Sequence, residues 1–453
     1  MDDQKKLMMS MTFDRSNISR MGGIRHLVVN IVAPELAFEK TDEIYPLNLG
    51  VVIDASSSMA SSVYGRRPDR ISNRFDTCLE AAKAAAIGVV ENLGNKDRLS
   101  VVSFSDDATI HVSGLNLDEP GKSQAMGEIS RIYTRGCTNL HDGWLKGAEH
   151  VAVQMDENDA YKNRVVILSD GHANRGIVKP EVLGDIAAGL RERGITSSTV
   201  GIGGDYSTDQ LEQIAVQGGG MLHHAQKPEE IVEVLMGELG SIRNTFAENL
   251  VLECTLSHNG NVLDGRVLGL PFHKEGNGLR CPVGFLRCGQ SRQVVIRVNI
   301  PELVSDDVIN IQINLRWKEV ACEGDQKSLR ETASLKVVEQ AVENLDIELG
   351  KIVAKMWLGE IIRRAMVMNR DGDYEGVEAF LKIEIADFKA YCEFLPEGEE
   401  LIKKVERTRR SVRRPMQEHA RKEVGTALFK MMRCSPDTRS QVNESSWEDY
   451  LEK

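Results

Sequence analysis

Residues 47–58 have the sequence LNLGVVIDASSS, an apolar run that ends on an aspartate followed by alanine and three serines. A short run rich in Val, Ile and Leu is typical of a strand that is buried on both faces, as in a parallel sheet. Asp and Ser directly after such a strand predict a tight turn, because their side chains bond to nearby backbone groups. We therefore expect a central strand whose carboxyl end carries several side-chain oxygens.

Apolar runs of this kind recur and alternate with longer amphipathic stretches. The later runs are RLSVVSF (98–104), RVVILSD (164–170) and ITSSTVGIG (195–203). Apolar residues at helical spacing occupy the stretches 75–93, 140–155, 180–194 and 228–242. This alternation predicts βαβ units and a doubly wound, Rossmann-like α/β domain over residues 46–243. Ligands of such sheets bind at the carboxyl ends of the strands.

The segments on both sides of this domain have the period of β-strands. Short alternating runs separated by Gly, Asn and Pro turns predict an antiparallel β-sandwich over residues 244–340. Residues 25–45 contain the similar run HLVVNIV, so we expect them to add strands to the same sandwich, with the α/β domain inserted into it. Residues 1–24 are expected to be a flexible segment.

The C-terminal part has a helical period. Apolar positions over residues 341–434 predict a helical hairpin or bundle, and the polar residues 435–453 predict a flexible tail. Residues 403–422, KKVERTRRSVRRPMQEHARK, are strongly basic. This pattern favours a solvated helix face, although it leaves open an RNA-binding accessory role. Aromatic residues that would stack on bases are absent from the segment.

Composition narrows the functional classes. A chain of 453 residues fits two or three domains, and 41% hydrophobic residues suffice for ordinary cores. The formal net charge of -12 disfavours non-specific binding of nucleic acid or anionic membrane by the chain as a whole. The eight cysteines are scattered, and neither an export signal nor a long unbroken apolar segment is evident. We expect a soluble cytoplasmic protein.

Side-chain oxygens gather at three predicted strand ends or following loops. They belong to the motif Asp54-Ala55-Ser56-Ser57-Ser58, to Thr138 in the loop RGCTNL (135–140), and to Asp170 in LSDG (168–171). Magnesium takes about six oxygen ligands and usually keeps some water among them. The three motifs together therefore predict a divalent-cation site.

In these motifs the chain resembles the von Willebrand factor A domain family, whose metal-ion-dependent adhesion site consists of D-x-S-x-S, a Thr in a G-x-T-N-like loop and an Asp in an [ST]-D-G turn. The resemblance covers about Leu47 to Leu239, and the flanking sequence is similar to bacterial intracellular members with an appended β-domain. Cys137 precedes the Thr where Gly is frequent, and the loop 61–74 is long, but neither departure removes a ligand oxygen. The resemblance implies ligands for Mg²⁺, or for Mn²⁺ or Ca²⁺, at Asp54, Ser56, Ser58, Thr138 and Asp170.

The resemblance also implies a function, a protein-interaction module or scaffold in which an Asp or Glu of a partner completes the coordination of the cation. Bacterial members often occur beside AAA+ ATPases of the MoxR type or with kinase and phosphatase partners, which are therefore the expected partner classes. The rim that would meet such a partner is expected to include Arg66, Arg67, Arg70 and His172, and its basic members would steer an acidic partner.

A rival interpretation is a metal-dependent phosphoryl-transfer or nucleic-acid enzyme. His172, two residues beyond Asp170, would then act as acid or base beside metal-bound water. The chain has no G-x-S-x-G nucleophile elbow, and a set of hydroxyl ligands differs from the carboxylate and His ligands of hydrolytic metal centres. We therefore predict a binding protein without catalytic residues.

Overall fold

The chain forms two compact units whose sequences are interleaved. The computed structural model describes residues 6–35, 46–61, 77–155, 161–171, 173–203, 208–225, 228–259, 261–303, 308–319, 326–341, 344–416 and 424. One unit consists of Ala37–Asn249 and Val320–Asp325, and the other of Met1–Leu36, Leu250–Glu319 and Gln326–Lys453. The first unit is therefore inserted in the sequence of the second.

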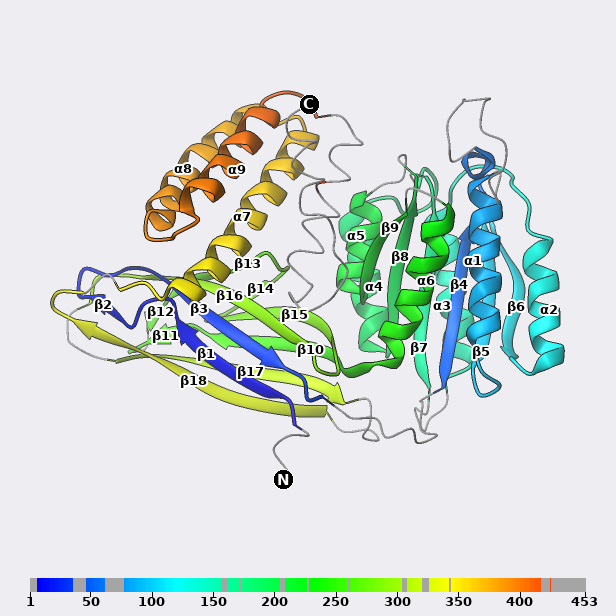
Figure 1. Ribbon diagram of the computed structural model, residues 1–453, viewed down its shortest axis with the longest axis horizontal. Helices are drawn as coiled ribbons and strands as arrows, with labels where there is room; N and C mark the ends of the chain where they lie inside the picture. The colour runs from blue at the N-terminus through cyan, green and yellow to red at the C-terminus, as the bar shows by residue number, and fades with distance from the viewer. Residues whose placement is uncertain are drawn as a thin grey trace. The chain divides into compact units, whose positions relative to one another are not determined.

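The first unit, which we call the α/β unit, is built on a six-stranded sheet within its described residues (Figure 1). The strand order is β6-β5-β4-β7-β8-β9; β6 is antiparallel to its neighbour and the other pairs are parallel. Its strands are β4 (Leu47–Asp54), β5 (Arg98–Phe104), β6 (Ala108–Asn116), β7 (Lys162–Ser169), β8 (Ile195–Ile202) and β9 (Gly219–Ala225).

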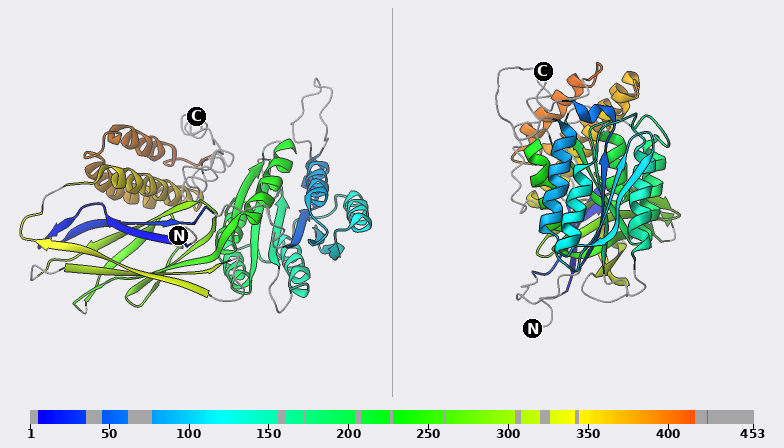
Figure 2. Two further views of the ribbon diagram at one scale, coloured as in Figure 1. Left: turned by 60° about the horizontal axis from the view of Figure 1, so that its bottom comes forward. Right: turned by 90° about the vertical axis from the view of Figure 1, so that its right-hand side faces the viewer.

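Helices cover both faces of this sheet, as its edge-on view shows (Figure 2, right). Alternate residues of β4, from Leu47 to Ile53, pack in one core with α1, α2 and α6. On the opposite face Val52 lies against α3. Ser197 and Thr199, on one face of β8, bond to α3 and α5, and α5 packs on α4. The doubly wound prediction is confirmed. The helices are α1 (Cys78–Asn92), α2 (Glu119–Ser130), α3 (Leu140–Val153), α4 (Pro180–Glu192), α5 (Thr208–Gln217) and α6 (Pro228–Arg243).

The second unit, the sandwich unit, stacks two mostly antiparallel sheets in the part of the chain that the structure describes. Their orders are β1-β3-β16-β13 and β14-β15-β10-β17-β18-β2, and β11 pairs with β12. β3 pairs with β16, so strands from before and after the insertion share one sheet. The strands are β1 (Met8–Phe13), β2 (Asn17–Ser19), β3 (Gly23–Val32), β10 (Thr245–Thr255), β11 (Ser257–His258), β12 (Asn261–Val262), β13 (Asp264–Leu268), β14 (His273–Glu275), β15 (Gly278–Arg287), β16 (Ser291–Ile300), β17 (Val308–Glu319) and β18 (Gln326–Val338).

Residues 1–24 are not one flexible segment as expected, because strands β1 and β2 lie within them. Met9, Met11 and Phe13 of β1 point inward, while the residues between them are exposed. β1 pairs with β3 along its whole length. The alternation is hard to see in the sequence because Met8, which is exposed, is as apolar as its inward-facing neighbours.

Helices α7 (Ile347–Arg370), α8 (Tyr374–Cys392) and α9 (Gly398–Ser411) form a layer against one sheet of the sandwich (Figure 2, left). Val28 and Val295 of this sheet share a hydrophobic core with the helices. None of the helices among the described residues is long and apolar enough to cross a membrane.

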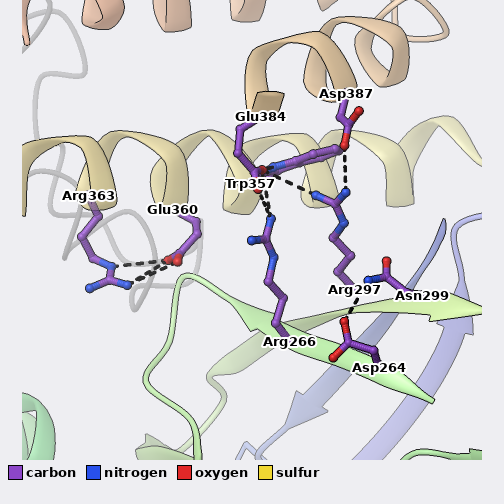
Figure 3. Close-up of polar contacts among 9 residues, drawn as sticks. All are labelled: Asp264, Arg266, Arg297, Asn299, Trp357, Glu360, Arg363, Glu384 and Asp387. Carbon is purple, nitrogen blue, oxygen red and sulfur yellow. Dashed lines mark hydrogen bonds and ion pairs between the residues drawn. The ribbon is translucent and has the colours of Figure 1, made fainter. Parts of the chain in front are cut away.

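Ion pairs set the position of α8 on the sheet (Figure 3). Arg266 and Arg297 lie side by side on β13 and β16, and both reach up to α8. Arg266 Nη2 lies 2.8 Å from Glu384 Oε1, and Arg297 Nη2 lies 3.1 Å from Asp387 Oδ2. Trp357 of α7 donates its indole N–H to Glu384 as well, at 2.8 Å. The charged contacts therefore connect two strands and two helices.

Candidate metal centre

Asp54 is the last residue of β4 and its side chain is fully buried. Its Oδ1 accepts a hydrogen bond from the backbone N–H of Ser56 at 2.9 Å, and its Oδ2 accepts one from Ser169 Oγ at 2.6 Å. Ser169 ends β7, the parallel neighbour of β4. The contact follows from the topology, because parallel neighbours end at the same edge of the sheet.

The hydroxyls of the D-x-S-x-S motif connect Asp54 to the other predicted carboxylate. Ser56 Oγ lies 2.9 Å from Ser58 Oγ, which donates to Asp170 Oδ1 at 2.7 Å. Thr138 faces the same place, because a Cβ added at Gly171 would lie 3.4 Å from both Ser58 Oγ and Thr138 Oγ1. The structure thus brings the five side chains predicted from the sequence to one edge of the sheet.

The loop that presents Thr138 is tied to the motif through the backbone. Arg135 N–H donates to the carbonyl of Ala55 at 2.7 Å, and Ser57 N–H donates to the carbonyl of Gly136 at 3.2 Å. Gly136 has φ +60, and a Cβ there would lie 2.1 Å from Asp106 Oδ2. Only glycine fits such a position without strain. The loop is therefore positioned by the motif that it completes.

Asp54 carries a buried carboxylate that no nearby positive charge balances within the described residues. Burial raises the pKa of its carboxyl, and the hydrogen bonds from Ser169 and Ser56 counteract this only in part. No basic side chain within the described ranges pairs with it. A buried carboxylate without a counter-charge is costly, and a cation at this edge would offset that cost.

Cys78, the first residue of α1, lies close enough to Asp54 and Asp170 to be affected by their charges. Burial, together with the negative charges of Asp170 and Asp54, raises the pKa of its thiol to about 12. The thiol therefore stays protonated near neutral pH and is neither a nucleophile nor a soft metal ligand here.

The donor set fits a hard divalent cation. Two carboxylates and three hydroxyls are all oxygen donors, the kind that Mg²⁺, Mn²⁺ and Ca²⁺ prefer. In the part of the chain that the structure describes, no group of three or more His, Cys, Asp or Glu side chains could hold a metal ion. A zinc-type centre of His and Cys is therefore not formed by these residues.

The four predicted rim residues, Arg66, Arg67, Arg70 and His172, all lie outside the described residues. The structure adds residues that the sequence did not single out. Ser169 bonds to Asp54, Asp106 accepts from the N–H of Cys137 at 3.3 Å, and Asn174 accepts from that of Thr138 at 3.1 Å. Ser169 lies at the end of one predicted strand and Asp106 lies two residues beyond another, a position that could have identified them.

The basic segment 403–422 is described as far as Met416, and within that part several of its charges have acidic neighbours. Arg409 and Arg413 both pair with Glu378 of α8. Lys404 pairs with Glu400, one helical turn away, at 3.3 Å. The pairs with Glu378 connect α9 and the residue Arg413 after it to α8, which provides a structural reason for part of the charge pattern.

Comparisons with known proteins agree with the fold. Residues 48–236 match the family model of the von Willebrand factor type A domain. The uncharacterized protein sll0103 of Synechocystis sp. is 24% identical over 292 residues, which cover 62% of this chain and 63% of that protein. The chain therefore spans less than two thirds of that relative.

Two solved structures resemble the chain far beyond the matched domain. The von Willebrand factor type A protein from Catenulispora acidiphila has a TM-score of 0.64 at 16% identity and covers 90% of both chains. The ArnB paralog VWA2 from Sulfolobus acidocaldarius has a TM-score of 0.55 at 15% identity, covering 95% of this chain and 100% of that one. At such low identity, the resemblance concerns the fold alone.

Proposed function

Because residues 48–236 form a von Willebrand factor type A domain, we propose that the protein is a metal-dependent interaction module that binds a partner protein. In this proposal Asp54, Ser56, Ser58, Thr138 and Asp170 hold Mg²⁺, with Mn²⁺ or Ca²⁺ as alternatives. When bound, the cation supplies a Lewis-acidic position that an Asp or Glu carboxylate of the partner can occupy.

The observation that carries the proposal is the buried charge of Asp54. Its carboxylate is 0% exposed, and it accepts hydrogen bonds from the hydroxyl of Ser169 and from the backbone N–H of Ser56. A site built only for stability would place a basic or apolar side chain there, because an unpaired buried charge destabilises the fold. A divalent cation is the counter-charge that the neighbouring oxygens suit.

The hydroxyls have a separate role in the proposal. The hydroxyl oxygens of Ser56, Ser58 and Thr138 are neutral ligands, which can coordinate a cation without cancelling its charge. A carboxylate from outside the chain therefore remains attracted to the site. This favours binding of an acidic partner, and it favours a role without turnover, since hydrolytic metal centres instead use carboxylate and His ligands.

The test is affinity capture from the native host, with Mg²⁺ and with a chelator. The baits are the wild type, the double variant Asp54→Ala, Ser56→Ala, and the matched control Ser57→Ala. Ser57 lies between two proposed ligands, but its hydroxyl bonds to the carbonyl of Gly136 at 3.0 Å. We expect wild type and control to retain a partner only with Mg²⁺, and the double variant to retain none.

The identity of the captured protein would decide between an AAA+ ATPase and a kinase or phosphatase. If the double variant retains the same partners, or if the chelator changes nothing, the proposal is wrong. An enzyme would instead convert many substrate molecules per chain, and such turnover in the presence of Mg²⁺ would favour the rival interpretation.

A further inference from the structure

Thr138 is the one proposed ligand that does not lie at the end of a strand or in the turn directly after one. Its loop precedes α3, so the place of its hydroxyl depends on what holds the loop. The backbone N–H of Thr138 donates to Oδ1 of Asn174 at 3.1 Å, and its carbonyl accepts from the backbone N–H of Asn174, also at 3.1 Å. A single residue therefore bonds to the peptide groups on both sides of Thr138.

Asn174 belongs to the chain segment that begins with another proposed ligand. It lies four residues after Asp170, which directly follows β7. Gly176, two residues further on, has φ +71, and a Cβ added there would lie 2.4 Å from Oδ1 of Asn139. Only glycine fits such a position without strain. Residues 174–176 thus lie in close contact with the loop that presents Thr138.

An ion pair closes these contacts into a ring. Asp106, two residues beyond β5, accepts a hydrogen bond from the N–H of Cys137 at 3.3 Å. Its Oδ1 also lies 2.8 Å from Nη1 of Arg175, the residue after Asn174. The side chains of Arg175 and Asp106 are 56% and 40% exposed, and exposed pairs contribute little by themselves. The partly buried bond between Asn174 and the N–H of Thr138 is therefore the stronger link between the two segments.

We propose that Asn174 is a positioning residue of the cation site. It acts through Thr138 and is not itself a ligand, and it holds the loop so that the hydroxyl of Thr138 and the carboxylate of Asp170 face the cation together. The inference rests on the proposed function, because it has content only if Thr138 is a ligand. Replacing a residue that orients a metal ligand typically weakens metal binding by about 10–100-fold.

The test is a double-mutant cycle on the full chain, with the Kd of Mg²⁺ measured by calorimetric titration. Asn174→Ala removes the acceptor, Thr138→Val removes the hydroxyl, and the two are also combined. Asn174→Asp keeps an acceptor oxygen at the same place. Asn92→Ala is the matched control, because the amide of Asn92 bonds to the carbonyl of Gly88 at 2.9 Å and lies at the end of α1 opposite to Cys78. Thermal unfolding in a chelator shows that each variant is folded.

We expect Asn174→Ala to raise the Kd about tenfold or more when Thr138 is present, and by less than about twofold when Thr138→Val is present. A residue that only stabilises the fold would have the same effect in both backgrounds. Asn174→Asp should bind Mg²⁺ at least as tightly as the wild type, and Asn92→Ala should bind it equally well. If Thr138→Val binds too weakly to measure, recovery of binding in Asn174→Asp relative to Asn174→Ala decides in favour of the inference, and its absence decides against it.

Other outcomes separate the inference from the proposed function. An unchanged Kd in Asn174→Ala, or an equal rise in both backgrounds, would overturn the positioning role of Asn174 and leave the proposed cation site intact. If Thr138→Val binds Mg²⁺ like the wild type, Thr138 is not a ligand, and the inference is wrong together with that part of the proposed site. If the wild type binds no Mg²⁺, both are wrong.

Discussion

At the scale of single residues, the carboxylate of Asp54 has opposite effects on folding and on cation binding. Burial raises its pKa, which means that the ionised form is less favourable in the folded chain than in the unfolded one. At neutral pH the charge therefore costs stability until a cation offsets it. Residues that serve a site often reduce the stability of the fold that holds them.

The variant Asp54→Asn tests this opposition. Without metal we expect it to be more stable than the wild type, because it removes the buried charge while its amide can still bond to Ser56 and Ser169. An increase in Tm of about 2–4 °C would correspond to roughly 1 kcal/mol in a domain of this size. In Mg²⁺ the order should reverse, since the variant loses the ligand. Thermal unfolding with a chelator and with Mg²⁺ measures the two Tm differences. If Asp54→Asn were less stable than the wild type in the chelator, the buried charge would not be what limits stability.

At the scale of elements, close packing between α3 and the sheet positions the loop that precedes α3. Gly147 of α3 lies against β4, where an added Cβ would lie 2.4 Å from Val52 Cγ2. Gly50 on β4 is similar, since a Cβ there would lie 2.9 Å from Val151. Small residues on both elements allow the helix to approach the central strand closely, and Thr138 lies just before the start of this helix.

We expect Gly147→Ala to destabilise the α/β unit by about 1–3 kcal/mol, since overpacking moves backbone or side chains. Gly189→Ala in α4 is the matched control, because nothing lies within 4 Å of the added Cβ. It should stabilise by roughly 0.5–1 kcal/mol, the usual effect of replacing Gly inside a helix. Urea denaturation of both variants measures these changes, and similar values for the two would contradict the close approach.

The helical layer and the sandwich meet at a buried acid and a buried imidazole. Asp14 accepts hydrogen bonds from His26 Nδ1 at 2.9 Å and from the hydroxyl of Tyr391 at 3.0 Å. Burial lowers the pKa of His26, and this outweighs the opposing effect of Asp14. Burial alone would raise the pKa of Asp14, but hydrogen bonds and charge from His26, together with Arg15, lower it overall.

Both shifts make the sandwich unit sensitive to acid. Above pH 6.5 the imidazole is neutral in both states; below it the unfolded chain binds a proton that folded His26 does not, so stability falls as the pH falls. Below about pH 3.8, the ordinary pKa of an aspartate, the lowered pKa of Asp14 adds a second loss of stability. We expect His26→Gln to flatten the dependence of the unfolding free energy on pH between 6.5 and 5, by at most about 1.4 kcal/mol per pH unit. An unchanged slope in urea denaturation at several pH values would contradict this.

At the scale of the whole molecule, the cation site belongs to one unit alone. All five proposed ligands lie within Ala37–Asn249. A ligand that binds only the folded state stabilises the unit that binds it, by about 2.7 kcal/mol at one hundred times its Kd. Stabilisation by the cation should therefore be confined to the α/β unit.

Calorimetry of the full chain tests this. We expect separate unfolding transitions for the two units, of which Mg²⁺ raises only one, and Asp54→Ala should abolish that rise. Intrinsic fluorescence can assign the transitions, because Trp144 lies in the α/β unit while Trp317 and Trp357 lie in the sandwich unit. If Mg²⁺ shifted both transitions equally, the cation would not act through this site alone.

The sequence by itself determined the elements whose signal is local. The fully buried strands β4, β7 and β8 were predictable from short runs rich in apolar and β-branched residues. The five candidate ligands were predictable because each lies at the end of a predicted strand or in a loop that follows one. β6, α2 and α5 were not predicted. β6 is an edge strand in which Val112 is the one buried residue, and α2 buries only Gly121, Ala125 and Ile129, so neither has a clear hydrophobic period.

The tertiary structure alone decided which distant groups meet. The bond between Ser169 and Asp54 joins residues 115 positions apart, and the contact between Arg266 and Glu384 spans 118. Periodicity reports whether a residue is buried, because burial depends on the face of its own element. Which partner it meets depends on the register and packing of elements far away in the chain, which no local pattern contains.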